Sequence, residues 1–219
     1  MSDNQLIGLA EDFFQNSLDS SPTSAIMRGH KKYFDQIEEL TEDQFQKEKE
    51  TVDNFIQRLN AIEKDNLTSR EQVTHGMLEF ALSSNQDSLL DRSWEFGAGV
   101  SGFTGFLIDY NQQMFVPDSE SADMMLKRLE LYKRLYSQIA EVQKEGLNNN
   151  RVATERNLLR TIDQLENYLA SSLDQDPLLL VNFSPEISGS EISEWKDKAK
   201  KIIEANIRPT VSAYLDQLK

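Results

Sequence analysis

The sequence predicts an all-α fold of long antiparallel helices, interrupted by one irregular segment. Apolar residues recur at intervals of three and four along most of the 219 residues, which is the period of an amphipathic helix. No stretch of useful length alternates apolar and polar residues, as a half-buried strand would. Residues that start or stop helices stand between the periodic runs. These three observations all favour helices over a sheet.

The periodic runs and their boundary residues divide the chain into expected helices. These helices cover residues 6–20, 23–28, 41–62, 68–90, 117–146, 150–169 and 191–219. Thr41 with Gln44, and Thr68 with Glu71, have the three-residue spacing of a capping box, in which the two residues satisfy each other's backbone donors. Both pairs therefore predict helix starts.

Glycine, asparagine and proline predict where the later helices end or bend. Gly146 stands where a C-terminal cap belongs, because glycine adopts the left-handed conformation at little cost. Asn150 is able to cap the helix that follows. Pro209 lacks a backbone donor, so we expect a kink or break near Ala205.

The irregular segment runs from Trp94 to Pro117. It holds four of the nine glycines and is rich in aromatic residues, yet it has only two formal charges, Glu95 and Asp109. Such a composition predicts either a segment that faces a ligand or a hydrophobic plug between helices. The residues expected to line a substrate cleft are Trp94, Phe96, Gly99, Ser101, Gly102, Phe103 and Tyr110.

Length and charge limit the domain organisation and the partners. We expect one helical domain over residues 1–219, with subdomains of about 1–93 and 118–219 joined by residues 94–117. The net charge of −14 disfavours nucleic-acid binding, since an acidic surface repels phosphates. No apolar run approaches the ~20 residues of a membrane span. Without the features of a signal peptide the chain as given is expected in the cytoplasm, with an export signal upstream left open.

Few residues are suited to catalysis or to metal binding. The chain has no cysteine and two histidines, whereas a zinc site takes three or four ligands. His75 follows Glu71 by four residues, so we interpret it as a polar helix residue that bonds to Glu71 or to solvent. Ser101 lacks the strand–serine–helix setting and the histidine base of a nucleophile. The sequence therefore predicts no catalytic residue and no metal ligand.

Four stretches carry a resemblance to a known family through their order and spacing. They are SPTSAIMRGH (21–30), LNAIEKDNLTSREQVTHGMLEFAL (59–82), SADMMLKRLELYKRLYSQIAEVQKEGLNNNRV (121–152) and IRPTVSAYLDQL (207–218). The chain resembles the N-terminal half of the bacterial family called domain of unknown function 885, whose full-length members look like zincin-type metallopeptidases. The family's His-Glu-x-x-His helix lies downstream of the matched region, and this sequence has no such motif.

The resemblance implies a non-catalytic helical half that shapes the substrate cleft of a zinc metallopeptidase-like protein. It implies zinc only for the C-terminal catalytic half, supplied in cis or in trans, and a peptide as substrate. The alternative is a stand-alone helical binding or scaffold protein. Because the periodic C-terminal run has no cap, we expect a longer protein and an apolar surface that favours homo-oligomers. The residues expected on that surface are Trp94, Phe96, Phe103, Phe106, Tyr110, Val211, Tyr214, Leu215 and Leu218.

Overall fold

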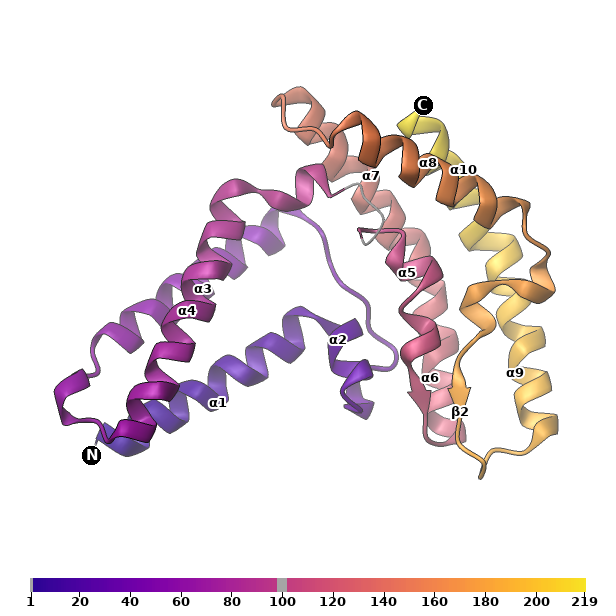
Figure 1. Cartoon of the computed structure of the whole chain (residues 1–219). Helices are drawn as coiled ribbons and strands as arrows, with labels where there is room; N and C mark the ends of the chain where they lie inside the picture. Colours follow the sequence, from indigo (N-terminus) through magenta and orange to yellow (C-terminus); the bar gives the residue numbers. More distant parts are fainter. Residues whose placement is uncertain (1, 98–101) are drawn as a thin grey trace. The chain divides into compact units, whose positions relative to one another are not determined.

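The chain forms two compact units, and each unit is built from two separate stretches of the sequence. A computed structural model describes residues 2–97 and 102–219, with side chains from residue 5 onward (Figure 1). The first unit holds residues 1–20 and 41–93, and the second holds residues 21–40 and 94–219. The expected subdomain over residues 1–93 therefore differs from the structure, because residues 21–40 belong to the second unit.

Helices make up most of both units, which confirms the all-α fold class. The α-helices of the first unit are α1 (Ser2–Ser20), α3 (Glu42–Asn60) and α4 (Ser69–Asp91). Those of the second are α2 (Pro22–Met27), α5 (Gly105–Ile108), α6 (Ser119–Glu130), α7 (Tyr132–Asn148), α8 (Glu155–Ala170), α9 (Gly189–Ile202) and α10 (Arg208–Leu218). Short 3-10 turns cover Lys31–Tyr33, Lys64–Asn66, Ser93–Phe96, Asn111–Gln113, Leu173–Gln175 and Pro177–Leu179. No helix among the described residues is long and apolar enough to cross a membrane.

In the first unit, α1, α3 and α4 pack side by side around one apolar core (Figure 1). The Thr41 side chain accepts a hydrogen bond of 3.2 Å from the backbone of Gln44, and Thr68 and Glu71 form the reciprocal capping box. Both predicted helix starts are confirmed. The core consists of Leu6, Leu9, Val52, Phe55, Leu59, Ile62, Leu67, Leu78 and Leu82.

The prediction for His75 is wrong. Its side chain is only 2% exposed, and it shares the inner face of α4 with Leu78 and Leu82. Neither ring nitrogen has a hydrogen-bond partner among the described residues. Val73 and Met77, which are also apolar residues at helical spacing on α4, are 62% and 68% exposed. Because α4 is apolar on opposite faces, the spacing alone does not select which face is buried.

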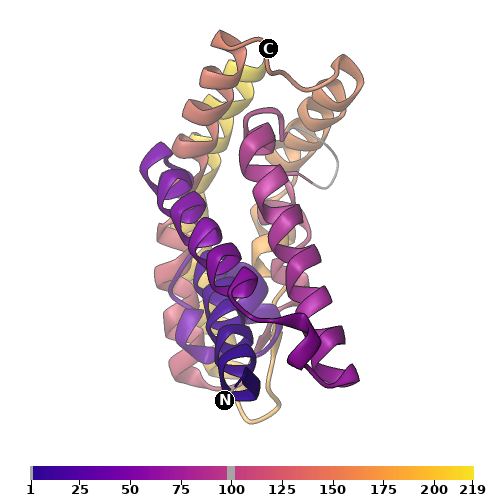
Figure 2. The ribbon, with the colours of Figure 1, turned by 90° about the vertical axis from the view of Figure 1, so that its left-hand side faces the viewer.

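In the second unit, α10 packs between α7 and α8, and α6 packs on α9 (Figures 1 and 2). A single parallel strand pair in the described residues joins β1 (Phe115–Val116) to β2 (Asn182–Phe183). The strands pair Phe115 with Asn182 and Val116 with Phe183. This short ladder ties the end of the irregular segment to the loop that precedes α9.

Two predicted helix boundaries in the second unit are wrong. The helix expected over residues 117–146 is divided at Leu131 and continues past Gly146 to Asn148. Asn150, expected as a cap, lies in the loop with φ of 57°, and Thr154 caps α8 instead. Gly146 therefore does not cap the helix; it lies against a second chain segment that contains Glu95.

The interruption expected near Ala205 is present. A π-helical turn, Ile203–Ile207, separates α9 from α10. Pro209 stands in the first turn of α10 and has no N–H to donate to a carbonyl oxygen of the preceding π-helical turn. Proline therefore interrupts the hydrogen-bond pattern without ending the helical rod.

Within the second unit, residues 21–40 are held against α6 by a buried arginine. Arg128, on α6, is fully buried, and its guanidinium donates to the Thr23 hydroxyl at 2.6 Å and to the Gln36 carbonyl. The Thr23 hydroxyl in turn donates to a Glu38 carboxylate oxygen at 2.6 Å, and the Thr23 N–H donates to the other oxygen at 2.9 Å. The Lys31 ammonium pairs with Asp118 at the start of α6. These bonds fix both ends of the segment.

The Lys31–Asp118 pair gives a pH-dependent prediction. The Lys31 hydrogen bond, followed by bonds from Ser121, lowers the pKa of Asp118 from 3.8 to about 2. A lowered carboxyl pKa stabilises the folded state above the unfolded pKa, and this stabilisation is lost as pH falls toward the folded pKa. We expect carboxyl-detected NMR to show Asp118 ionised at pH 3, and Lys31→Met to raise its pKa toward 3.8. An unchanged Asp118 pKa in that variant would contradict the pairing.

Candidate functional site: an apolar groove

The irregular segment begins as a 3-10 turn that contains Trp94 and Phe96 and continues through α5 to Tyr110. Gly102 and Phe103 lie in the turn before α5. Two predicted site residues, Gly99 and Ser101, lie outside the described residues. The remaining predicted site residues therefore lie in two stretches. Trp94 and Phe96 are in the 3-10 turn, and Gly102, Phe103 and Tyr110 are around α5.

The stretch around α5 is packed as a plug against α7. The hydroxyl of Tyr136 donates to the carbonyl of Phe103 at 2.8 Å, and that of Tyr132 donates to the carbonyl of Phe106 at 2.9 Å. Burial raises the pKa of both tyrosines, so the phenols stay protonated and remain donors. A Cβ at Gly105 would lie 2.9 Å from the Tyr110 ring. Phe103 and Tyr110 thus contribute to packing.

The 3-10 turn, in contrast, opens on a groove of about 470 Å³. The groove is lined by Phe96, by Leu147 at the end of α7, by Val152 in the following loop and by Leu218 of α10. The side chains of Phe96, Leu147 and Val152 are 38%, 64% and 57% exposed. This volume lies within the range of about 300–1,000 Å³ that small-molecule and side-chain pockets occupy. Phe96 is the predicted site residue that this groove contains.

An ion pair with a buried carboxylate and a partly exposed guanidinium lies at the groove, where Glu95 is a lining residue. The Glu95 side chain is 0% exposed, and the Nε of Arg151 donates to its carboxylate. Gly146 lets the two chain segments meet, because a Cβ there would lie 2.7 Å from the Glu95 carbonyl oxygen and 2.6 Å from that of Arg151. Glycine is the residue that permits this approach. Glu95 was not among the predicted site residues, although its place as one of two charges in an otherwise neutral segment was a usable signal.

Comparison with known proteins identifies the family. A family model described as "Bacterial protein of unknown function (DUF885)" matches residues 22–219. The chain belongs to the DUF885 family. No curated protein and no solved structure matches it significantly. The family expected from the order of the sequence motifs is confirmed, and the matched region contains all of the second unit except Ser21.

The lining of the groove in this DUF885 chain is suited to binding an apolar group. Its apolar lining residues are Phe96, Leu147, Val152, Ala153, Leu158 and Leu218, and its polar lining residues are Glu95, Gln143, Lys144, Gln217 and Lys219. Lys219 pairs with Glu166 at 2.7 Å, while the Gln143 amide oxygen accepts a hydrogen bond of 2.8 Å from Tyr214. No group of three or more His, Cys, Asp or Glu side chains among the described residues could hold a metal ion.

The apolar surface expected near the C-terminus is mostly buried. Val211, Tyr214 and Leu215 are 0%, 2% and 6% exposed, because they face α7 and α8. That part of the prediction is wrong. Leu218, which was also expected on that surface, does line the groove together with Phe96.

Proposed function

We propose that this DUF885 chain is the non-catalytic helical part of a zinc metallopeptidase-like protein, and that its groove holds an apolar segment of a peptide substrate. One observation carries the proposal: three apolar side chains, Phe96, Leu147 and Val152, are each more than one third exposed at the same groove. Folded proteins rarely keep such clusters open unless a partner or ligand covers them.

The energetics fit a weak peptide site. Burying one large apolar side chain is worth about 1.5–3 kcal/mol. Association opposes this gain, through lost rigid-body freedom and through ordering of the peptide. Two peptide side chains in the groove contribute about 3–6 kcal/mol before these costs, so we expect a dissociation constant of about millimolar or weaker. Affinity of this order is sufficient for a substrate-positioning surface.

The described residues do not fit a zinc centre. The ring of His75 is buried in the first unit. The described residues contain no group of three or more His, Cys, Asp or Glu side chains that could bind zinc. Zinc and the catalytic residues would then come from a C-terminal half in cis or in trans. In the alternative function, the same groove serves a stand-alone binding or scaffold protein.

A labelled peptide tests the binding proposal. The probe is a fluorescein-labelled decapeptide with two adjacent leucines among neutral polar residues, followed by fluorescence anisotropy. Leu147→Asp places a charge in the groove and is expected to weaken binding at least about tenfold, a change of ~1.4 kcal/mol. Leu159→Asp is the matched control, since Leu159 is 53% exposed on α8 and does not line the groove. Equal affinities of the two variants would refute the site.

Addition of a separately expressed C-terminal half separates the two functions. The metallopeptidase-like proposal expects a complex whose peptide hydrolysis falls when Leu147 is replaced by Asp. A chain that binds the decapeptide but neither associates with that half nor supports hydrolysis would establish the stand-alone alternative.

A further inference from the structure

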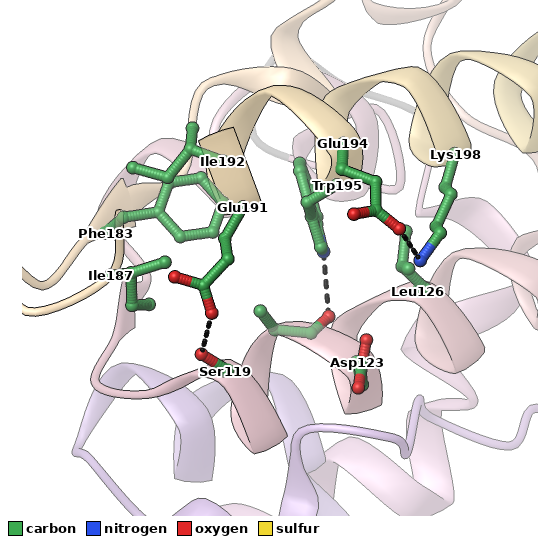
Figure 3. Close-up of a pocket in the computed structure, with 11 residues that line it drawn as sticks. Ser119, Asp123, Leu126, Phe183, Ile187, Glu191, Ile192, Glu194, Trp195 and Lys198 are labelled. Carbon is green, nitrogen blue, oxygen red and sulfur yellow. Dashed lines mark hydrogen bonds and ion pairs between the residues drawn. The ribbon is translucent and has the colours of Figure 1, made fainter. Parts of the chain in front are cut away.

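A second cavity of about 210 Å³ lies between α6 and α9, beside the loop that contains β2 (Figure 3). Trp195 forms its inner wall, and the indole N–H donates to the backbone oxygen of Ala122 at 2.8 Å. Phe183 packs edge-on against Trp195, with ring centroids 5.1 Å apart. Leu126 and Ile192 supply aliphatic walls. The hydrogen bond and the ring contact hold the two aromatic side chains in place.

The rim of this cavity is acidic. The carboxylates of Asp123, Glu191 and Glu194 line it, with Lys198 as the single basic lining residue. The Lys198 ammonium pairs with Glu194 at 2.7 Å (Figure 3), and the charge of Asp123 also contributes to raising the pKa of Lys198. Ser119 donates to Glu191 at 2.9 Å. Three carboxylates against one ammonium leave the rim with a formal charge of −2.

The size of the cavity restricts what it can bind. A volume of 210 Å³ is below the range of about 300–1,000 Å³ for drug-sized ligands. It equals the liquid volume of about seven water molecules at ~30 Å³ each, which is sufficient for one long side chain. The net negative charge of the rim repels an anion and attracts a cation.

We propose that this cavity binds a basic side chain of a peptide, with the guanidinium or ammonium group at the acidic rim and the stem against Trp195 and Phe183. Aromatic rings attract cations through their electron-rich faces, and arginine and lysine stems pack well on apolar surfaces. Lys198 shows the same chemistry within the chain, because its ammonium lies beside Glu194 and near Asp123. The site does not depend on the apolar groove, which has a different set of lining residues.

Two small probes that differ in charge test this site. N-acetyl-arginine amide carries one positive charge, and N-acetyl-citrulline amide has nearly the same shape without it. In NMR titrations of the full chain, the arginine probe is expected to shift the Trp195 indole signal saturably and the citrulline probe to bind at least fivefold more weakly. No saturable shift with the arginine probe, or equal binding of the two probes, would overturn the proposal.

A charge-matched pair of variants locates the binding. Asp123 is exposed at the rim, so Asp123→Asn is expected to fold normally and to weaken the arginine probe about three- to tenfold. Glu120→Gln removes the same charge from α6 at a residue that does not line the cavity, and its affinity is expected within twofold of the unaltered chain. Equal weakening by both variants would indicate attraction by net charge alone and would overturn the proposed site.

Discussion

Replacement of Gly146 by alanine is expected to lower the free energy of unfolding by about 2–3 kcal/mol. The added Cβ would lie 2.6 Å from the Arg151 carbonyl oxygen and 2.7 Å from that of Glu95. Both contacts are with backbone atoms, so no side-chain rotation relieves them. The helix or the two crossing segments must move, and the groove above them is expected to lose peptide binding. Urea unfolding followed by circular dichroism measures the loss.

Gly76 provides the control for this prediction. It is also a helical glycine, on α4, but a Cβ there would have no neighbour within 4 Å. Gly76→Ala is therefore expected to stabilise the chain by about 0.5–1 kcal/mol, through the better helix propensity of alanine. Opposite signs at the two glycines are the expected result. A stabilising Gly146→Ala would show that the segments do not meet as described.

Replacement of Arg128 by alanine is expected to cost about 3–5 kcal/mol. The side chain is fully buried, and its removal leaves a cavity and takes the donors from the Thr23 hydroxyl and the Gln36 carbonyl. Arg128→Lys is expected to recover only part of the loss, because one ammonium does not reproduce the planar fork of a guanidinium. The measurement is again urea unfolding, with limited proteolysis to report on residues 21–40.

Arg160→Ala is the matched control, because Arg160 is exposed on α8. Its effect is expected within about 0.5 kcal/mol. Cleavage within residues 21–40 should increase in Arg128→Ala and stay unchanged in Arg160→Ala. If the two variants unfold at the same urea concentration, Arg128 does not hold the segment.

Local signals in the sequence were sufficient for most helices. Thr41 and Thr68 start helices as predicted, because a cap acts within one turn and needs no tertiary contact. Gly146 and Asn150 were misassigned for the opposite reason. Gly146 allows the backbone of α7 to lie close to that of Glu95, which is about fifty residues away in sequence, and no local pattern predicts such a contact. The attachment of residues 21–40 through Arg128 is likewise a long-range contact.

The site was predictable only in part. Aromatic density correctly directed attention to the segment that contains Phe96, which lines the groove. The same density selected Phe103 and Tyr110, which pack around α5, because an aromatic residue in a core and one in a groove look alike in sequence. Leu147 and Val152 were not among the predicted site residues, since the helix was expected to end at Gly146, whereas α7 continues to Asn148. The groove requires the folded positions of all these elements.

The π-helical turn between α9 and α10 determines which residues of α10 lie on the same face as the buried residues of α9. The residues that it keeps on one buried face are spaced by four: Trp195, Ala199, Ile203, Ile207, Val211 and Leu215. In an unbroken α-helix each such step overshoots a full turn by about 40°, so the last residue would have rotated to the opposite side. The wider turn at Ile203–Ile207 absorbs part of this drift. A chain one residue shorter there would rotate α10 by about 100° and turn Tyr214 away from Gln143. The register of α10 against α7 therefore depends on the number of residues in this turn.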